Sequence, residues 1–300
     1  MSYPEPAILM TVDVEDWFQV ENFKQFIPFS SWPSHELRVE KNTYRILDLF
    51  DSIEVNSPTN LKATFFVLGW VAERLPRLVR EIHSRGHEVG SHGYYHGLGG
   101  KSSSDALRMD LIDSKKLLED IVGDRIYGYR APSFSINNDM LRTIEDCGYL
   151  YDSSYNSFGA HDRYGRIDLS HSTGNGIAAR ISDGFYELPV SNIRLGNCTL
   201  PWGGGGYFRL APASIFRLGV RSILKKEKAY LFYMHPWEID PYQPKVTAAP
   251  PFYRFRHYVN LKKTLSKLVK FLMAFNECPF ITCHQYLKSH LPSAKADGLR

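Results

Sequence analysis

The sequence predicts an α/β fold in which parallel strands alternate with helices, and three observations lead to this expectation. Short apolar runs rich in β-branched and aromatic residues, typical of buried strands, recur along the chain. Between these runs, apolar residues keep the spacing of amphipathic helices. The chain has 300 residues, 43% of them hydrophobic, and can therefore bury a large core. A barrel and a doubly wound sheet both fit this alternation.

The expected elements follow one another as strand and helix over most of the chain. Strands are expected at residues 8–12, 61–69, 87–92, 125–131, 185–193, 228–236 and 280–287, and helices at residues 44–53, 71–82, 103–121, 140–144, 212–224 and 261–275. Residues 155–185 are polar and are expected to be irregular, and residues 203–206 to form a flexible loop. The segment 174–179 matches a dinucleotide fingerprint only nominally, because no buried strand precedes it.

Composition excludes several classes of protein. The net charge of +4, with 36 basic and 32 acidic side chains, is too balanced for a nucleic-acid partner over the whole surface. Four scattered cysteines without a CxxC pair indicate reduced thiols rather than a disulfide framework: Cys147, Cys198, Cys278 and Cys283. Neither a signal-like segment nor an apolar run of ~20 residues is present, so a soluble, cytoplasmic chain is expected.

Three acidic residues, Asp13, Glu15 and Asp16, follow the first apolar run. In α/β folds the carboxyl ends of parallel strands carry the chemistry. Neighbouring carboxylates repel one another unless a cation or a proton intervenes. The cluster therefore indicates a metal site with a spare carboxylate as base. An equally good interpretation is that Asp16 caps the next helix and that Glu15 faces water.

His92 and His96 lie four positions apart, so that both rings can face the same side of the backbone. Two imidazoles and one carboxylate form a three-ligand shell with an open position for water, as in catalytic zinc sites. Taken alone, a glycine-rich loop with two surface histidines is the simpler interpretation. The balance shifts because five candidate residues fall at or just after the carboxyl ends of expected strands: Asp13, Asp16, His92, Arg130 and His235.

These residues resemble the motifs of the polysaccharide deacetylases, which hydrolyse N- or O-acetyl groups of sugars in a distorted (β/α) barrel. The resemblance covers most of residues 7–240 and rests on TVDVEDW, SHGYYH, RAPS and YMHP. It implies a distorted, incomplete (β/α) barrel with parallel strands.

The resemblance also implies a role for each residue. Asp13 is the general base, Arg130 holds that base, and His235 is the general acid. The implied metal ligands are Asp16, His92 and His96, with Glu15 as the alternative to Asp16. Ser133 stands where the family has an aromatic residue, and a backbone N–H there contributes to the oxyanion site. The implied cofactor is one divalent metal, with Zn²⁺ expected first and Co²⁺, Ni²⁺ or Mn²⁺ as alternatives.

Four further blocks are similar to the exosortase-associated exopolysaccharide deacetylases: VDVEDWF, GGGYFR, HPWEIDP and FRHYVNL. This similarity implies one deacetylase barrel over residues 1–300, with residues 242–300 as a C-terminal extension packed on it. The implied function is hydrolysis of N-acetyl groups on an amino sugar of an exopolysaccharide or its precursor. The alternatives are an amidohydrolase acting on a small ureide or formamide, and a non-catalytic sugar-binding module.

Substrate contacts are expected from side chains close to the motifs: Trp17, Trp202, Tyr207, Arg209, Ser133 and Trp237. Flat aromatic faces can stack on sugar rings, although packing inside the barrel is equally expected for any single one of them.

The expected partner is an acetylated saccharide, with no nucleic acid. The helix at 261–275 carries Lys262, Lys263, Lys267 and Lys270 on its polar side. A solvated face is the favoured interpretation, and peripheral contact with the inner membrane surface or with exopolysaccharide assembly proteins is the alternative.

Overall fold

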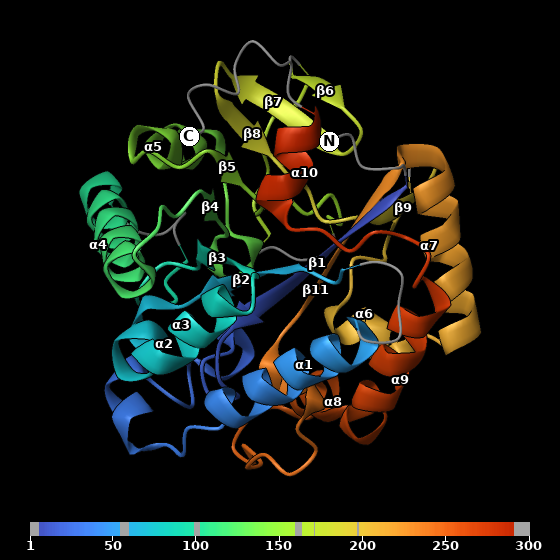
Figure 1. The fold of residues 1–300 in the computed structure, drawn as a ribbon. Coiled ribbons are helices and arrows are strands. Elements are labelled where there is room, and N and C mark those ends of the chain that lie inside the picture. The colour runs from blue at the N-terminus through green and yellow to red at the C-terminus, as the bar shows by residue number, and fades with distance from the viewer. Residues whose placement is uncertain are drawn as a thin grey trace.

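The computed structural model describes residues 6–54, 60–98, 103–159, 164–170, 172–196 and 198–290. Its centre is a sheet of nine strands within these residues, shown in Figure 1. In sheet order the strands are β11 (Ala229–Met234), β1 (Ala7–Val14), β2 (Ala63–Val67), β3 (Glu88–Ser91), β4 (Gly128–Tyr129), β5 (Tyr151–Asp152), β8 (Phe185–Glu187), β7 (Ala178–Ser182) and β6 (Thr173–Asn175). A separate hairpin consists of β9 (Asn192–Leu195) and β10 (Cys198–Pro201).

Neighbouring strands run parallel from β11 to β8, and the pairs β8–β7 and β7–β6 are antiparallel. Among the described residues, the two edge strands β11 and β6 do not pair with each other, so the sheet curls without closing. The expected fold, an incomplete (β/α) barrel with parallel strands, is confirmed.

Strand β1 lies inside the sheet, and all eight of its residues are buried. Its register pairs Val12 with Met234 of β11 on one side and with Phe65 of β2 on the other. The carboxyl ends of β1, β3, β4 and β11 therefore open at the same edge of the sheet.

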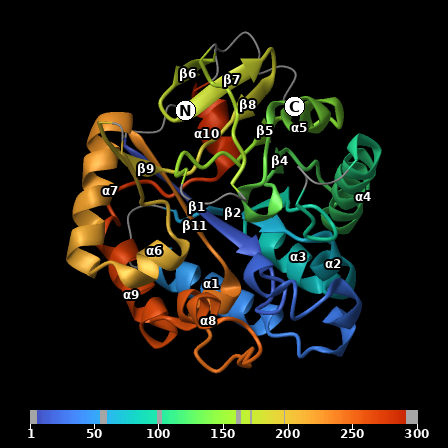
Figure 2. The same cartoon turned by 180° about the vertical axis from the view of Figure 1, so that it is seen from behind.

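Ten helices accompany the sheet in the described part of the chain. They are α1 (Val39–Glu54), α2 (Gly69–Arg74), α3 (Pro76–Ser84), α4 (Ser104–Val122), α5 (Asn138–Asp146), α6 (Gly205–Leu210), α7 (Ala213–Glu227), α8 (Pro251–Tyr258), α9 (Leu261–Ala274) and α10 (Cys283–His290). Short 3₁₀ helices are η1 (Glu21–Phe23), η2 (Phe29–Ser34), η4 (Pro132–Phe134) and η5 (Pro236–Ile239). In both Figure 1 and Figure 2, α2, α3 and α4 lie on one side of the molecule and α7 and α9 on the other.

Local sequence explains where the helices begin and end. The side chain of Ser103 accepts a hydrogen bond from Ala106 N at the start of α4, and Gly123 ends that helix in a left-handed conformation, both as expected. The prediction of a single helix at residues 71–82 is wrong. Leu75 leaves the helical region because Pro76 follows it, and the chain divides there into α2 and α3.

Two expectations for the middle of the chain are also wrong. Residues 155–185 contain the antiparallel pair β6 and β7, whose turn holds the rejected dinucleotide match. Residues 203–206 are not a free loop, because Gly204 pairs with Tyr233 of β11 and a Cβ atom on Gly204 would lie 2.1 Å from Tyr233 O. Only a glycine lets the backbone approach this closely, at a φ of +126°.

The C-terminal region departs from expectation in two places. Helix α8, between η5 and α9, is absent from the expected helices. The last expected strand contributes only the isolated bridges of Phe280 to Ile8 and Leu61. Thr282 and Gln285 then exchange side-chain to backbone hydrogen bonds of 3.0 Å each, a capping arrangement that starts α10 instead.

Helix α9 packs against the barrel through Phe271, whose ring contacts the rings of Phe208, Phe216 and Phe232. Lys267 does not share the exposed face of α9 with Lys262, Lys263 and Lys270. Its ammonium group contacts the carbonyl oxygens of Phe208 and Ala211 at the end of α6, and burial lowers its pKa to about 8. Among the described helices, none is both long and apolar enough to cross a membrane.

Candidate functional site

The carboxyl edge of the sheet surrounds one cavity of about 300 Å³. Five of the residues expected to bind the metal or to act as acid or base line it: Asp13, Glu15, His92, His96 and His235. Asp13 comes from β1, Glu15 from the turn after β1, and His92 from the residue after β3. His235 directly follows β11. Strand ends far apart in the sequence thus place their polar side chains around the same space, as the sequence predicts.

Glu15, His92 and His96 form the cluster best suited to a metal ion. Their ligand atoms lie within 4.8 Å of one another, and all three residues are buried. Glu15 Oε2 is 2.5 Å from His96 Nε2 but has no hydrogen-bond partner among the described residues. His92 Nδ1 donates to Arg130 O at 2.8 Å, which leaves Nε2 as the free ligand atom. An orphaned carboxylate oxygen beside two imidazoles fits a divalent metal.

The electrostatics put Glu15 and His92 in the protonation states that bind metals. Burial opposes the ionisation of Glu15, but its interactions with the imidazoles of His96 and His235 outweigh it and hold the pKa of Glu15 well below its usual range. Burial lowers the pKa of His92 to about 4. At neutral pH the cluster therefore offers a carboxylate and a neutral imidazole, the forms that coordinate a metal.

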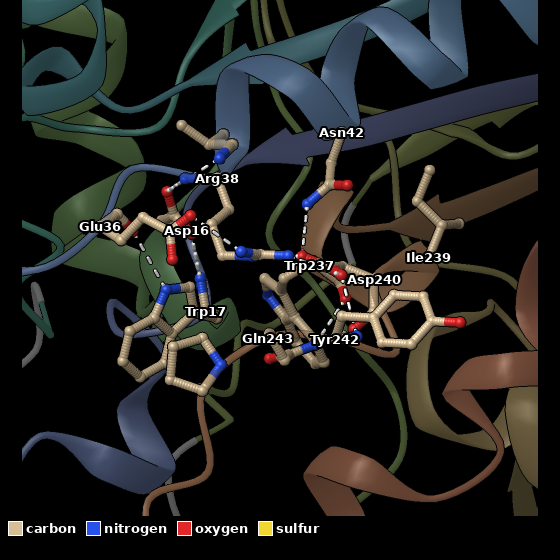
Figure 3. A network of polar contacts seen from close by, with 12 residues as sticks. Asp16, Trp17, Glu36, Arg38, Asn42, Trp237, Ile239, Asp240, Tyr242 and Gln243 are labelled. Carbon is tan, nitrogen blue, oxygen red and sulfur yellow. Dashed lines mark hydrogen bonds and ion pairs between the residues drawn. The ribbon is translucent and has the colours of Figure 1, made fainter.

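Asp16 is not part of this cluster, which corrects the expected ranking of the two acids. Its Oδ1 accepts from Trp17 N at 2.8 Å, and its Oδ2 accepts from Arg38 N at 2.7 Å and Val39 N at 2.8 Å (Figure 3). The carboxyl group thus caps the start of α1. Burial raises the pKa of Asp16 to about 6 in spite of these donors.

The reason is a tight turn after β1. Glu15 N donates to Asp13 O at 3.0 Å, so Asp13 and Glu15 both line the cavity while the next side chain faces α1. Figure 3 shows the network continuing from Arg38 to Asp240. Arg38 Nε donates to Asp240 Oδ2 at 2.6 Å, and Asn42 donates to the same oxygen at 3.2 Å. This network ties the start of α1 to the segment after His235.

Asp13 and Arg130 form a buried ion pair, as the family resemblance of their motifs implies. Arg130 Nη1 donates to Asp13 Oδ1 at 2.8 Å and to Thr11 Oγ1 at 2.6 Å. Its Nε donates to Ser153 O at 2.9 Å and its Nη2 to Ser153 Oγ at 2.8 Å. With no exposed surface and partners on three sides, the guanidinium fixes the orientation of the Asp13 carboxylate.

Two buried acidic residues that lie side by side support this ion pair. Asp152 and Glu187 are neighbours on β5 and β8 and lie within hydrogen-bond reach of each other. Ser154 Oγ accepts from Ala131 N at 2.7 Å and donates to Asp152 Oδ1 at 2.6 Å, which connects the pair to the residue after Arg130. Burial raises the pKa of both acids, and the Asp152 carboxylate raises that of Glu187 further, so that Glu187 carries the shared proton.

Replacing Glu187 by Gln is expected to flatten the pH dependence of stability. The folded chain keeps a proton on Glu187 that the unfolded chain releases above the ordinary pKa of 4.5. The free energy of unfolding of the wild type should therefore fall as the pH rises from that value towards the raised pKa of the folded state. The side-chain amide of Gln keeps a hydrogen-bond donor at this position, but it has no proton that is released in this pH range. Urea unfolding from about pH 5 to about pH 9 measures both slopes.

The control is Asp139→Asn, which removes an exposed carboxylate with 91% of its side-chain surface accessible. This control should keep the wild-type slope. Equal slopes for wild type and Glu187→Gln would show that Glu187 is not the protonated member of the pair.

His235 also lines the cavity, close to the carboxylates of Glu15 and Asp13. Its Nε2 is 3.4 Å from Glu15 Oε1 and 3.8 Å from Asp13 Oδ2, and its Nδ1 is 2.8 Å from Glu238 Oε1. Burial opposes protonation, but the carboxylates of Glu15, Glu238 and Asp13 outweigh it and raise the pKa of His235 to about 9. His235 is therefore a proton donor at neutral pH.

Glu238 is a site residue that sequence reasoning missed. Its side chain accepts from the backbone N–H of His235 at 3.1 Å as well as from the ring. The signal is present in HPWE, where an acid three residues after the histidine can close back onto it at the start of η5.

Arg209 lines the cavity but does not offer a free guanidinium, which corrects its expected role in substrate binding. Its Nε donates to Glu238 Oε2 at 2.8 Å. The terminal nitrogens donate to carbonyl oxygens at and after the end of α8: those of His257 at 2.7 Å, Val259 at 2.9 Å and Arg256 at 2.9 Å. Arg209 therefore holds Glu238, and through it His235, in place.

The aromatic residues that were expected to contact the substrate divide into two groups. Tyr207 and Trp237 line the cavity, and Trp237 Nε1 donates to Glu15 Oε1 at 3.3 Å. Trp17 is buried and donates to Glu36 O, and Trp202 stacks on Phe216 at an interplanar angle of 9°. Neither of these two residues lines the cavity, and both pack in the protein interior or against α7.

Ser133 lines the cavity where the sequence predicts an oxyanion-site backbone. Ser133 and Phe134 have φ values of 54° and 58°, two consecutive left-handed residues without a glycine. Such strain persists only where the surrounding structure imposes it, and it is concentrated at functional sites. His96 shares this conformation, with a φ of 52°.

The fold and the site together define a partial (β/α) barrel with a two-histidine, one-carboxylate cluster at the carboxyl edge of its sheet. Residues 38–151 match the polysaccharide deacetylase family, and residues 153–288 match a domain of unknown function, DUF3473. The family resemblance of the sequence motifs is therefore confirmed over residues 38–151.

Curated relatives match part of the chain. A peptidoglycan-N-acetylglucosamine deacetylase of Bacillus cereus is 33% identical over 107 residues, 36% of this chain and 47% of that protein. A peptidoglycan deacetylase of Helicobacter pylori is 31% identical over 137 residues, 42% of this chain and 43% of that protein. The chain thus spans less than half the length of these relatives.

A solved structure shares the fold over nearly the whole chain. A crystal structure from Mycobacterium smegmatis, assigned to the polysaccharide deacetylases, superposes with a TM-score of 0.61 at 18% identity. The superposition covers 96% of this chain and 92% of that one. The similarity therefore extends across both matched regions, which share one sheet here.

Proposed function

We propose that the protein is a metal-dependent hydrolase that removes N-acetyl groups from an amino sugar of an exopolysaccharide or its precursor. The observation that carries the proposal is the position of the Glu15, His92 and His96 cluster between the Asp13–Arg130 pair and the His235–Glu238 pair. One buried cavity thus offers a metal-ligand set, a candidate base and a candidate acid. The match of residues 38–151 to the polysaccharide deacetylase family supports the reaction class.

The side chains divide the chemistry as follows. A divalent metal held by Glu15, His92 and His96 would supply Lewis acidity towards an amide carbonyl and acidify water. Asp13, fixed by Arg130, accepts the proton of the attacking water. His235, oriented by Glu238, donates a proton to the leaving amine.

Two observations favour this function over the alternatives. A sugar-binding module needs no acid and base pairs, whereas both pairs are buried and in place here. A ureide or formamide hydrolase requires a small, closed pocket. The cavity here reaches the exposed residues Phe252 and Phe255, so that a larger substrate can enter.

The test compares substrates of different classes. Purified protein is expected to release acetate from short N-acetylglucosamine oligomers and to leave allantoin and formamides unchanged. Turnover of a ureide together with no acetate from any acetylated sugar would overturn the proposal. Metal analysis of protein purified without added metal, with Zn²⁺, Co²⁺, Ni²⁺ and Mn²⁺ then tested singly, identifies the active ion.

A cytoplasmic location at the inner membrane surface, with the exposed lysines of α9 as the contact, stays a prediction. Co-sedimentation with anionic vesicles at physiological salt tests it.

A further inference from the structure

Two large aromatic side chains are exposed at the mouth of the cavity. Phe252 and Phe255 of α8 have 63% and 57% of their surface accessible, and both line the same cavity as the metal-ligand cluster. Large exposed aromatic residues that line a binding cavity are typical of recognition sites rather than of core packing.

The structure holds α8 firmly in this position. Arg209 binds the carbonyl oxygens at and after the end of the helix, and the ring of His257 stacks on Trp237 at 4.2 Å. On its other side, His257 contacts the ring of Phe23 at a centroid distance of 4.6 Å. The two exposed phenylalanines therefore project from a fixed helix, so that little ordering is required when a ligand binds.

A carboxylate lines the cavity beside this helix. Glu21 belongs to η1, which packs on α8 through Phe23, and it is also part of the cavity wall. Its Oε2 is buried and has no hydrogen-bond donor among the described residues, although Lys24 forms an ion pair with it at 3.6 Å. The Glu21 side chain keeps 18% of its surface accessible, so its carboxylate can accept a hydrogen bond from a ligand in the cavity.

We propose that Phe252, Phe255 and Glu21 form a saccharide subsite that binds a sugar unit next to the one whose acetyl group reacts. This inference rests on the proposed function and specifies its substrate as an oligomer. Flat aromatic faces fit the apolar face of a sugar ring, and a carboxylate oxygen accepts from ring hydroxyls. A lipid surface is disfavoured as the occupant, because insertion of the phenylalanines would bring the Glu21 carboxylate against the membrane.

The test measures binding and turnover for a monomer and a pentamer of N-acetylglucosamine. The variants are Phe252→Ala with Phe255→Ala, and Glu21→Gln. Tyr253→Ala is the matched control, because Tyr253 lies on the same helix, is 38% exposed and does not line the cavity. Binding is measured calorimetrically in the Asp13→Asn background, and circular dichroism checks the fold of each variant.

The double phenylalanine variant is expected to weaken pentamer binding and raise the pentamer KM by about tenfold. Glu21→Gln should raise the pentamer KM by about threefold to tenfold. For both variants, the monomer KM and the metal content should stay at wild-type values. Tyr253→Ala should match the wild type throughout.

Several results would overturn the subsite: no pentamer binding by the wild type, equal losses on monomer and pentamer, or wild-type binding by the double variant. Loss of vesicle binding in the double variant, with pentamer binding intact, would overturn it in favour of a membrane contact. Pentamer binding that depends on the phenylalanines but occurs without acetate release would support the subsite and reject the proposed hydrolysis.

Discussion

The variant Glu15→Gln is expected to lose its bound metal and to lower acetate release by at least about a hundredfold. Glu15 supplies the only carboxylate oxygen in the described cluster with His92 and His96, and an amide oxygen is a weaker ligand than a carboxylate. His92→Ala and His96→Ala should behave in the same way while the fold persists, because the barrel core does not depend on the site. Metal content per chain, measured by mass spectrometry beside initial rates, checks all three variants.

Asp16→Asn provides the matched control, since it makes the same chemical change one residue further along. It should keep the metal but lower the free energy of unfolding by about 1–3 kcal/mol, because a neutral amide replaces a buried acceptor of three backbone N–H groups. The opposite pattern, with metal lost from Asp16→Asn and retained in Glu15→Gln, would restore Asp16 as the ligand.

Asp13→Asn is expected to retain the metal and to lose turnover by about 10² to 10⁴, the usual contribution of a general base. Asn preserves the shape of the side chain and can still accept from Arg130, so that the loss reports on proton transfer rather than on packing. His235→Ala should lose a comparable factor while also keeping the metal. Initial rates of acetate release and metal content are measured on the same samples.

The outcome for Asp13 has a clear alternative. Loss of metal together with partial activity in Asp13→Asn would identify Asp13 as a ligand rather than the base. Glu238→Gln separates orientation from chemistry: it should reduce turnover less than His235→Ala, because the histidine ring stays in place and loses only its charged partner.

Much of the fold could be predicted from the sequence because the signals were local. The buried strands β1, β2 and β11 are short apolar runs, and Ser103 and Gly123 mark the ends of α4. The failures came where tertiary contacts decide the conformation. The glycines after residue 202 are packed by β11, and the chain after Phe280 turns into α10 once Thr282 is capped.

The candidate site, too, could be predicted only in part from the sequence. Strand ends placed Asp13, His92 and His235 correctly around one cavity and Arg130 beside Asp13, since parallel topology alone brings them together. The choice between Glu15 and Asp16 could not be made from sequence, because it depends on the turn after β1 and on amide groups that α1 presents. The role of Arg209 depends on carbonyl groups about 50 residues away, for which no local pattern exists.

The hydrogen bonds of Arg209 have a consequence for how this protein can evolve by recombination. Arg209, Glu238, His235 and the carbonyl groups at and after the end of α8 all belong to the stretch after β5, so the acid and its supports can pass between genes as one block. The ligands Glu15, His92 and His96 and the base Asp13 all belong to the stretch before it. The two blocks also meet outside the cavity, because Arg130 donates to Ser153, Arg38 donates to Asp240 and β1 pairs with β11. A recombined block would therefore have to fit along the sheet as well as across the cavity.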